Sequence, residues 1–271
     1  MNNYSVLMSV YYKEKAEFLY ESINSIVNQT VPTDDFVLVC DGPLGDDLNK
    51  VIEDFQSRYD YFNVIRLKKN GGLGNALNIG IKQCKNELVA RMDSDDISRP
   101  DRCEKQLRVF DNKTDISIVS GIIEEFTLSS DTPDNRRVPP ETQEEITNFA
   151  KKRNPFNHPA VMYKKSAVEM AGGYKDFYLL EDYYLWIRML LAGCKGYNIQ
   201  EPILWMRAGS DLYKRRSGLK YAVSQKALFK FMKDNKFISS KQYLINIVVR
   251  GISSLVPNFL REFLFKKMVR N

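Results

Sequence analysis

The segment Leu88-Val89-Ala90-Arg91-Met92-Asp93-Ser94-Asp95-Asp96 decides the fold class of this chain. Leu88–Met92 has the length and apolar character of a buried strand, and three carboxylates follow it directly. Such crowded carboxylates raise one another's pKa values unless a cation lies between them. Hard oxygen ligands suit Mg²⁺ or Mn²⁺, either of which can hold a diphosphate. A solvated acidic turn is the competing interpretation of so short a pattern.

Three further apolar stretches of strand length precede this segment: Ser5–Val10, Phe36–Cys40 and Val64–Leu67. Residues 19–27 carry apolar side chains at helical spacing between the first two. Strands that are apolar throughout and alternate with helices are typical of a mostly parallel sheet with helices on both faces. We therefore predict an α/β, Rossmann-like fold, in which ligands bind beyond the carboxyl ends of the strands.

Two other polar segments follow predicted strands. Tyr11-Tyr12 follows the first strand, and Cys40-Asp41-Gly42 ends the second. Asp41 could accept the imide N–H of a uracil, although Asp-Gly also forms an ordinary turn. The Gly-rich stretch Asn70–Gly80 invites a dinucleotide-binding interpretation, but Leu77 occupies the place of the third glycine and the stretch follows the third strand. We interpret it as a close backbone approach that shapes a nucleotide pocket.

The second half of the chain is less regular. Ser129–Pro140 is predicted as a loop, and helices are expected over Glu141–Lys151 and Glu181–Ala192. Glu181-Asp182 would open the last helix, where the helix dipole favours acids, so these residues are either caps or a general base. His158 is the single histidine and is flanked by prolines, which favours a place in a site.

Composition limits the protein class. The 271 residues are 44% hydrophobic and 27% charged, which is typical of a folded soluble protein. The four cysteines are widely spaced and predict neither a zinc site nor a disulfide framework. Neither a signal region nor an apolar run of about 18 residues is found, so we expect a cytoplasmic protein without a membrane span.

Charge is distributed unevenly along the chain. Fourteen Lys and Arg residues and two acids lie from Lys214 to the C-terminus, giving +12 there, whereas the whole chain carries +6. This tail has helical apolar faces, at Val248, Ile252 and Leu255 and again around Phe259–Met268. It could pack on the catalytic domain or lie on an anionic membrane surface. Nucleic acid is a poorer partner, because the tail is too apolar and lacks a known binding module.

Taken in order, these motifs resemble the family 2 glycosyltransferases of the GT-A fold, in particular those of bacterial capsule, O-antigen and exopolysaccharide synthesis. The resemblance covers about residues 4–210. The matching segments are Ser9–Tyr12, Cys40–Gly42, Asn70–Gly80, Asp93–Asp96, His158–Met162, Gly172–Tyr174 and Glu181–Asp182.

The resemblance implies a role for each matched residue. Val10, Tyr11, Asp41 and Asn70 would hold the uridine, and Asp93 with Ser94 would face the ribose or diphosphate. Asp95 would ligate Mn²⁺ or Mg²⁺. Asp182 would be the catalytic base, with Glu181 beside it at the acceptor.

Two positions depart from the family pattern. Leu77 stands where an arginine is common, so Arg91 is a candidate to replace that contact to the donor. Arg207 is followed by Ala208-Gly209 where many relatives have a histidine, so His158 or water would complete the metal's ligands.

The resemblance thus implies a metal-dependent, inverting hexosyltransferase that uses a UDP-sugar and a saccharide or lipid-linked saccharide acceptor, at the inner face of the cell membrane. The expected organisation is a catalytic domain over residues 1–213, with its nucleotide part at 1–113 and its acceptor part at 114–213, and a basic helical tail over 214–271. A nucleotidyltransferase and a non-catalytic sugar-nucleotide sensor remain the alternatives.

Overall fold

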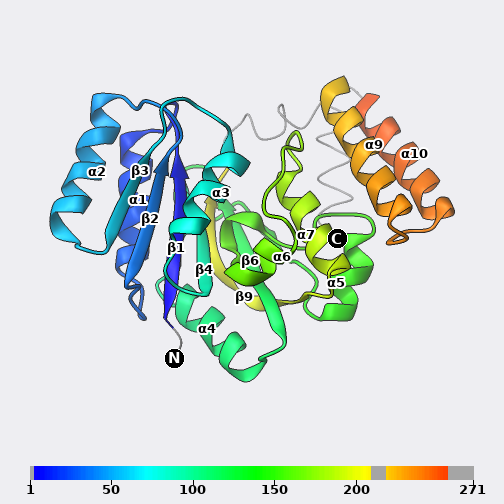
Figure 1. The fold of residues 1–271 in the computed structure, drawn as a ribbon, viewed down its shortest axis with the longest axis horizontal. Coiled ribbons are helices and arrows are strands. Elements are labelled where there is room, and N and C mark those ends of the chain that lie inside the picture. The colour runs from blue at the N-terminus through cyan, green and yellow to red at the C-terminus, as the bar shows by residue number, and fades with distance from the viewer. Residues whose placement is uncertain (1–2, 209–217, 256–271) are drawn as a thin grey trace.

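The computed structural model describes residues 3–208 and 218–255, in which strands and helices alternate as the sequence predicts (Figure 1). The strands are β1 (Tyr4–Val10), β2 (Asp35–Cys40), β3 (Phe62–Arg66), β4 (Leu88–Asp93), β5 (Ile97–Ser98), β6 (Ile116–Phe126), β7 (Asn135–Arg137), β8 (Met162–Lys164) and β9 (Lys195–Arg207). The helices are α1 (Ala16–Val27), α2 (Asp46–Arg58), α3 (Leu73–Gln83), α4 (Arg102–Asn112), α5 (Gln143–Ala150), the 3₁₀ turn η1 (His158–Ala160), α6 (Lys165–Met170), α7 (Glu181–Leu191), α9 (Leu219–Asp234) and α10 (Ser240–Leu255).

One sheet runs through the described part of the chain in the order β3-β2-β1-β4-β8-β6-β9-β5, and β7 pairs with β6. The neighbours β3, β2, β1 and β4 are parallel, as are β6 and β9. Strands β8 and β5 run antiparallel to their neighbours. The prediction of a mostly parallel sheet is confirmed, and β1, β2 and β4 end at the same edge.

Helices cover both faces of the sheet because strands β1, β2 and β4 direct apolar side chains toward both faces. One core places Val6, Met8 and Leu38 under α1, α2 and α4. The other places Leu7, Val37 and Val39 under α3, α6 and α7. Gly80 lets α3 lie against the strands, since a Cβ there would stand 2.3 Å from the Leu7 Cδ1 atom. Strand and helix periodicity therefore fixes the layers.

The sheet does not stop at the boundary expected near residue 113. Strand β6 follows it at once and is buried along most of its length, in a region that the sequence analysis did not assign to a strand. Strands β6, β8 and β9 extend the sheet formed by β1–β4, so the expected nucleotide and acceptor parts share one sheet. The loop predicted over Ser129–Pro140 contains the short strand β7.

The tail begins with two described helices that dock on this body. Leu228, Phe229 and Met232 of α9 pack with Tyr183 and Ile187 of α7. Helices α9 and α10 lie side by side, at the end of the molecule farthest from α2 (Figure 1). The apolar face predicted around Phe259–Met268 lies outside the described residues. Within residues 3–208 and 218–255, no helix combines the length and apolarity needed to cross a bilayer.

Candidate active site

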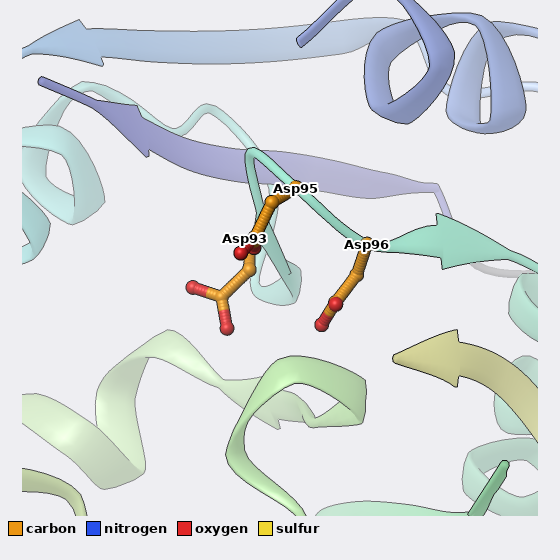
Figure 2. A group of neighbouring side chains, drawn as sticks. All are labelled: Asp93, Asp95 and Asp96. Carbon is orange, nitrogen blue, oxygen red and sulfur yellow. The ribbon is translucent and has the colours of Figure 1, made fainter. Parts of the chain in front are cut away.

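Three carboxylates gather at the turn between β4 and β5. Asp93, Asp95 and Asp96 each place an oxygen within 4.8 Å of the others. Figure 2 shows Asp93 and Asp96 extending to the same side of this turn. The turn is short because Ile97-Ser98 immediately pairs with β9, at Trp205 and Leu204. The acidic segment singled out in the sequence is therefore a real cluster, at the sheet edge where ligands bind.

The cluster carries excess negative charge. Burial raises the pKa of Asp95 to about 7, and Asp93 and Glu14 add to the rise. Burial likewise raises the pKa of Asp96 well above its usual range, with Asp95 and Asp93 contributing. Glu14 also accepts a hydrogen bond from the Ser94 hydroxyl, at 2.6 Å. Carboxylates that resist ionisation in this way gain most from a nearby cation.

The donor set fits a divalent ion. Asp96 accepts a hydrogen bond from the Arg207 backbone N–H through Oδ1, at 2.9 Å, while its buried Oδ2 has no partner in the described chain. Buried polar atoms rarely stay unpaired, so this oxygen calls for a ligand. Carboxylate oxygens are the ligands that Mg²⁺ and Mn²⁺ prefer. Asp95 and Asp96, with Asp93 beside them, are the residues that would hold such an ion.

Arg91 lies beneath the cluster. It stands two residues before Asp93 on β4, so both side chains leave the same face of the strand. Its Nη1 donates to Asp93 Oδ2 at 2.8 Å and its Nη2 donates to Asp93 Oδ1. The side chain is 1% exposed. Arg91 therefore fixes the Asp93 carboxylate by a two-point hydrogen bond and stays below the surface of the site.

Helix α7 brings a second acidic pair toward this edge. Asp182 Oδ2 accepts a hydrogen bond from Asn154 Nδ2 at 2.6 Å. Burial raises the pKa of Glu181 to about 6, with Asp182 and Asp176 adding to the rise and Arg91 opposing it. Trp186, one turn later, is fully buried against Phe156 and holds the helix on the sheet.

Tyr174 connects the two acidic groups. Burial raises the pKa of Tyr174, Arg91 opposes the rise, and Asp182 and Asp93 both add to it. The phenol thus lies within electrostatic reach of the β4 carboxylate, the arginine and the α7 carboxylate. Asn78 of α3 fixes the Tyr174 backbone by donating to its carbonyl at 2.6 Å and accepting from its N–H at 2.8 Å. Side chains of β4, of α7 and of Tyr174 therefore come close together in the fold, although they are far apart in the sequence.

The Gly-rich stretch lies against the end of β2. The two Asp41 oxygens accept the backbone N–H groups of Gly71 and Gly72, at 2.7 and 3.0 Å, and Asn70 Nδ2 donates to the Asp41 carbonyl. Gly42 has φ +93°, and a Cβ there would stand 2.7 Å from the Asn70 nitrogen. The close backbone approach predicted from the sequence is confirmed. Asp41 thus holds the Gly-rich segment in place by these hydrogen bonds. Its contact to a uracil stays a prediction.

Val10 and Tyr11, at the end of β1, were both predicted to contact the uridine. Val10 is 1% exposed and belongs to the core, and its carbonyl accepts the Asp41 N–H at 2.8 Å. Tyr11 is 39% exposed at the same sheet edge. Of these two residues, Tyr11 alone offers a side chain to a ligand, because the Val10 side chain points into the sheet's packed face.

His158 lies outside the carboxylate cluster. Its Nε2 lies 3.0 Å from the Tyr174 hydroxyl, and its ring packs against Trp186. Burial, with Arg91 nearby, lowers the pKa of His158 well below its usual range. The structure therefore does not bring His158 into the Asp93, Asp95 and Asp96 cluster, and its role as a metal ligand stays a prediction.

Leu77 and Arg207 mark the two positions at which the sequence departs from the family pattern, and the structure places them differently. Leu77 is fully buried in the core under α3 and cannot reach a ligand. Arg207 touches the cluster by its backbone N–H to Asp96 and by its Nε, which donates to the Asp95 carbonyl at 3.0 Å. Its Nη2 binds Glu21 at 2.5 Å. Arg207 thus supports the acidic turn without ligating a metal.

The sequence of the chain matches the family model described as Glycosyl transferase family 2 over residues 5–170. The chain belongs to glycosyltransferase family 2. The family assignment replaces the nucleotidyltransferase alternative.

Curated relatives of this glycosyltransferase include a galactosyltransferase and an amylovoran biosynthesis enzyme. It is 41% identical over 269 residues to the UDP-Gal:alpha-D-GlcNAc-diphosphoundecaprenol beta-1,3-galactosyltransferase of Escherichia coli, covering 98% of this chain and 96% of that one. It is 35% identical over 267 residues to the amylovoran biosynthesis glycosyltransferase AmsE of Erwinia amylovora, covering 97% and 98%.

Solved structures confirm the GT-A fold of the glycosyltransferase. S. aureus TarS 1–349 in complex with UDP-GlcNAc matches with a TM-score of 0.68 at 17% identity, over 98% of this chain and 76% of that one. The mannosyltransferase PcManGT of Pyrobaculum calidifontis, in complex with GDP-Man and Mn²⁺, matches with a TM-score of 0.62 at 13% identity, over 98% and 80%.

Three residues of the site gave weak signals or none in the sequence. Asn154, which binds Asp182, and Glu14, which binds Ser94, lie in segments without a distinct motif. Tyr174 follows a glycine pair whose shape depends on Arg188, which donates to the Gly173 carbonyl at 2.7 Å. A polar residue beside proline, as in Asn154-Pro155, is the one local sign that could have suggested a site.

Proposed function

We propose that this glycosyltransferase is an inverting, metal-dependent enzyme that moves a hexose from a UDP-sugar to a hydroxyl of a lipid-linked saccharide. The observation that carries the proposal is the carboxylate cluster with its unpartnered Asp96 oxygen, near Tyr174, which also lies within electrostatic reach of Asp182. One acidic group would bind the donor diphosphate through a cation, and the other would serve the acceptor.

The residues divide the work between donor and acceptor. Asp95 and Asp96 would hold Mn²⁺ or Mg²⁺, and Asp93 would stay on Arg91 and face the ribose or diphosphate with Ser94. A divalent ion, when bound, offsets charge on the leaving UDP. Tyr11, Asp41 and Asn70 would line the uridine side, because they meet at the ends of β1 and β2.

Asp182 would take the proton of the attacking hydroxyl, which makes that oxygen a better nucleophile. Asn154 orients the carboxylate of this base by its hydrogen bond to Oδ2. Glu181 would contact the acceptor beside it. A single displacement at C1 of the donor, with Asp182 as the base, inverts the anomeric centre.

Relatives favour particular substrates for the first assay. The Escherichia coli relative is named for UDP-Gal and a GlcNAc-diphosphoundecaprenol acceptor. We therefore place UDP-galactose first in a panel with UDP-glucose and their N-acetyl forms, with a lipid-diphosphate-linked N-acetylhexosamine as acceptor. The enzyme would meet such an acceptor as a cytoplasmic protein bound peripherally to the inner face of the membrane.

Thermal shift tests the donor and the metal. A selective rise in melting temperature is expected with one UDP-sugar and Mn²⁺, because ligands that bind only the folded state stabilise it. EDTA should remove most of that rise. UDP affinity that is indifferent to EDTA would overturn the metal assignment, and binding without turnover would leave the sensor alternative.

Product analysis tests the mechanism. From an α-linked UDP-hexose, NMR of the product should show a β linkage, and an α linkage contradicts single displacement. Asp182→Asn keeps the shape but cannot take a proton, so kcat should fall by roughly 10²–10⁴-fold while UDP binding persists. Near-normal turnover in this variant would return Asp182 to a helix-capping role.

A further inference from the structure

Helix α10 has two distinct faces. Its inner face is attached to the body, since Asn246 Nδ2 and Arg250 Nη2 donate to the carbonyls of Lys151 and Lys152, both at 2.9 Å. Its outer face carries four aliphatic side chains, none of which packs in a described core. Their exposed fractions are 63% for Leu244, 51% for Ile245, 51% for Val248 and 50% for Val249.

These four side chains form a single stripe. Positions 244, 245, 248 and 249 recur at helical spacing, and the inward-facing positions 246 and 250 fall between and after them. Lys241 is exposed and lies one turn before Leu244, on the same stripe. A contiguous apolar strip on the surface of a soluble domain marks a contact with a partner or a membrane.

Helix α9, which contacts α10, also carries exposed positive charge. Its outer positions alternate exposed Lys220, Lys226 and Lys230 with Leu219 and Val223, which are 82% and 59% exposed. Residues 218–255 contain seven Lys and Arg residues and one acid, Asp234. An aliphatic strip flanked by lysines complements a surface that is apolar below and anionic above, as at a bilayer interface.

We infer that the outer faces of α9 and α10 form the surface by which this glycosyltransferase lies on an anionic lipid bilayer. This inference rests on the proposed function, because binding to a bilayer would bring the enzyme to a lipid-linked acceptor. Because α9 packs directly on Tyr183 and Ile187 of α7, the surface is attached to the helix that begins with Glu181-Asp182. Binding to lipid therefore positions the acceptor side of the site relative to the bilayer.

Vesicle flotation of the full chain tests this surface without any sugar donor. Wild type should float with vesicles of phosphatidylglycerol and phosphatidylethanolamine and much less with phosphatidylcholine alone. Replacing Leu244, Ile245, Val248 and Val249 together with serine should reduce the bound fraction at least about tenfold, because interfacial binding scales with buried apolar area. Changing Lys220, Lys226 and Lys241 to glutamine should remove most of the preference for anionic vesicles.

A matched control removes four exposed apolar side chains elsewhere: Leu128→Ser, Val138→Ser, Met170→Ser and Leu191→Ser. This control should float as wild type does, and both fourfold variants should keep the wild-type melting temperature. With a water-soluble acceptor, the α10 variant should also keep its turnover, so a defect in lipid binding is distinct from a failure of the proposed chemistry.

Three results would overturn the inference. Wild type that stays unbound at low salt excludes a lipid surface, and an α10 variant that floats normally excludes this face. Concentration-dependent self-association in sedimentation, lost in the α10 variant and unaccompanied by lipid binding, would assign the stripe to a second copy of the chain.

Discussion

Replacing Asp95 by asparagine should make the metal-free protein more stable. Burial and the nearby Asp93 and Glu14 carboxylates raise the pKa of Asp95 to about 7. In the folded state this carboxyl keeps its proton up to that pH, whereas in the unfolded chain it loses the proton near pH 4. Folding therefore binds a proton between these pH values, so this group's contribution to stability falls as pH rises from about 4 to about 7 and is constant above.

The size of the effect follows from the pKa difference. Three pH units correspond to about 4 kcal/mol, at roughly 1.4 kcal/mol per unit. Asp95 is partly open to water, which weakens its interactions, so we expect about half of that, near 2 kcal/mol. For a protein of this size, the melting temperature of Asp95→Asn should rise by about 4–8 °C.

Differential scanning calorimetry in EDTA at pH 8 measures the difference, and repeating it toward pH 4 should make the difference vanish. Asp131→Asn, on an exposed loop, is the matched control and should change little. Saturating Mn²⁺ should reverse the order, because wild type binds the ion and the variant has lost a ligand. An Asp95→Asn protein no more stable than wild type in EDTA at pH 8 would refute the reasoning.

Three further predictions follow from the site and the packing. Asn154→Ala should lower kcat by up to about 10²-fold with UDP affinity unchanged, because Asp182 loses the donor that orients it; steady-state kinetics and calorimetric titration would show the split. Glu181→Gln should abolish an inflection near pH 6 in the profile of kcat/KM, since burial raises the pKa of Glu181 to about 6; an inflection that survives belongs to another group. Gly80→Ala should cost about 1–3 kcal/mol in urea unfolding, because its Cβ would meet β1 and β2, whereas Gly45→Ala, with no atom within 4 Å, should cost far less.

The sequence predicted those strands and helices whose own apolar periodicity is distinct. Strands β1, β2 and β4 are apolar throughout, and their periodicity differs from that of the helices between them, so their bounds were predicted to within about two residues. Strand β6 was missed although Ile116–Ile123 is itself an apolar run of strand length. Only its last part, where Glu124 and Glu125 pair with Arg136 and Arg137, depends on contacts that local periodicity does not report.

The same limit applies to the site. Asp93, Asp95 and Asp96 are neighbours in the sequence, so their clustering could be predicted. Contacts such as Asn154 to Asp182 depend on how distant loops meet. The aromatic surroundings of His158 likewise depend on distant segments, because its ring packs against Trp186 of α7.

The contact between Asn78 and Tyr174 has a consequence for protein engineering. Hybrid transferases are often sought by joining the donor half of one enzyme to the acceptor half of another. A junction near residue 113 would separate Asn78 from the Tyr174 backbone it holds at both N–H and carbonyl, and β4 from β8. The parts of the chain on either side of such a junction are therefore held together by direct contacts. A working chimera must carry the partner of Tyr174 across the junction, so new specificity is better sought by changing side chains within one parent.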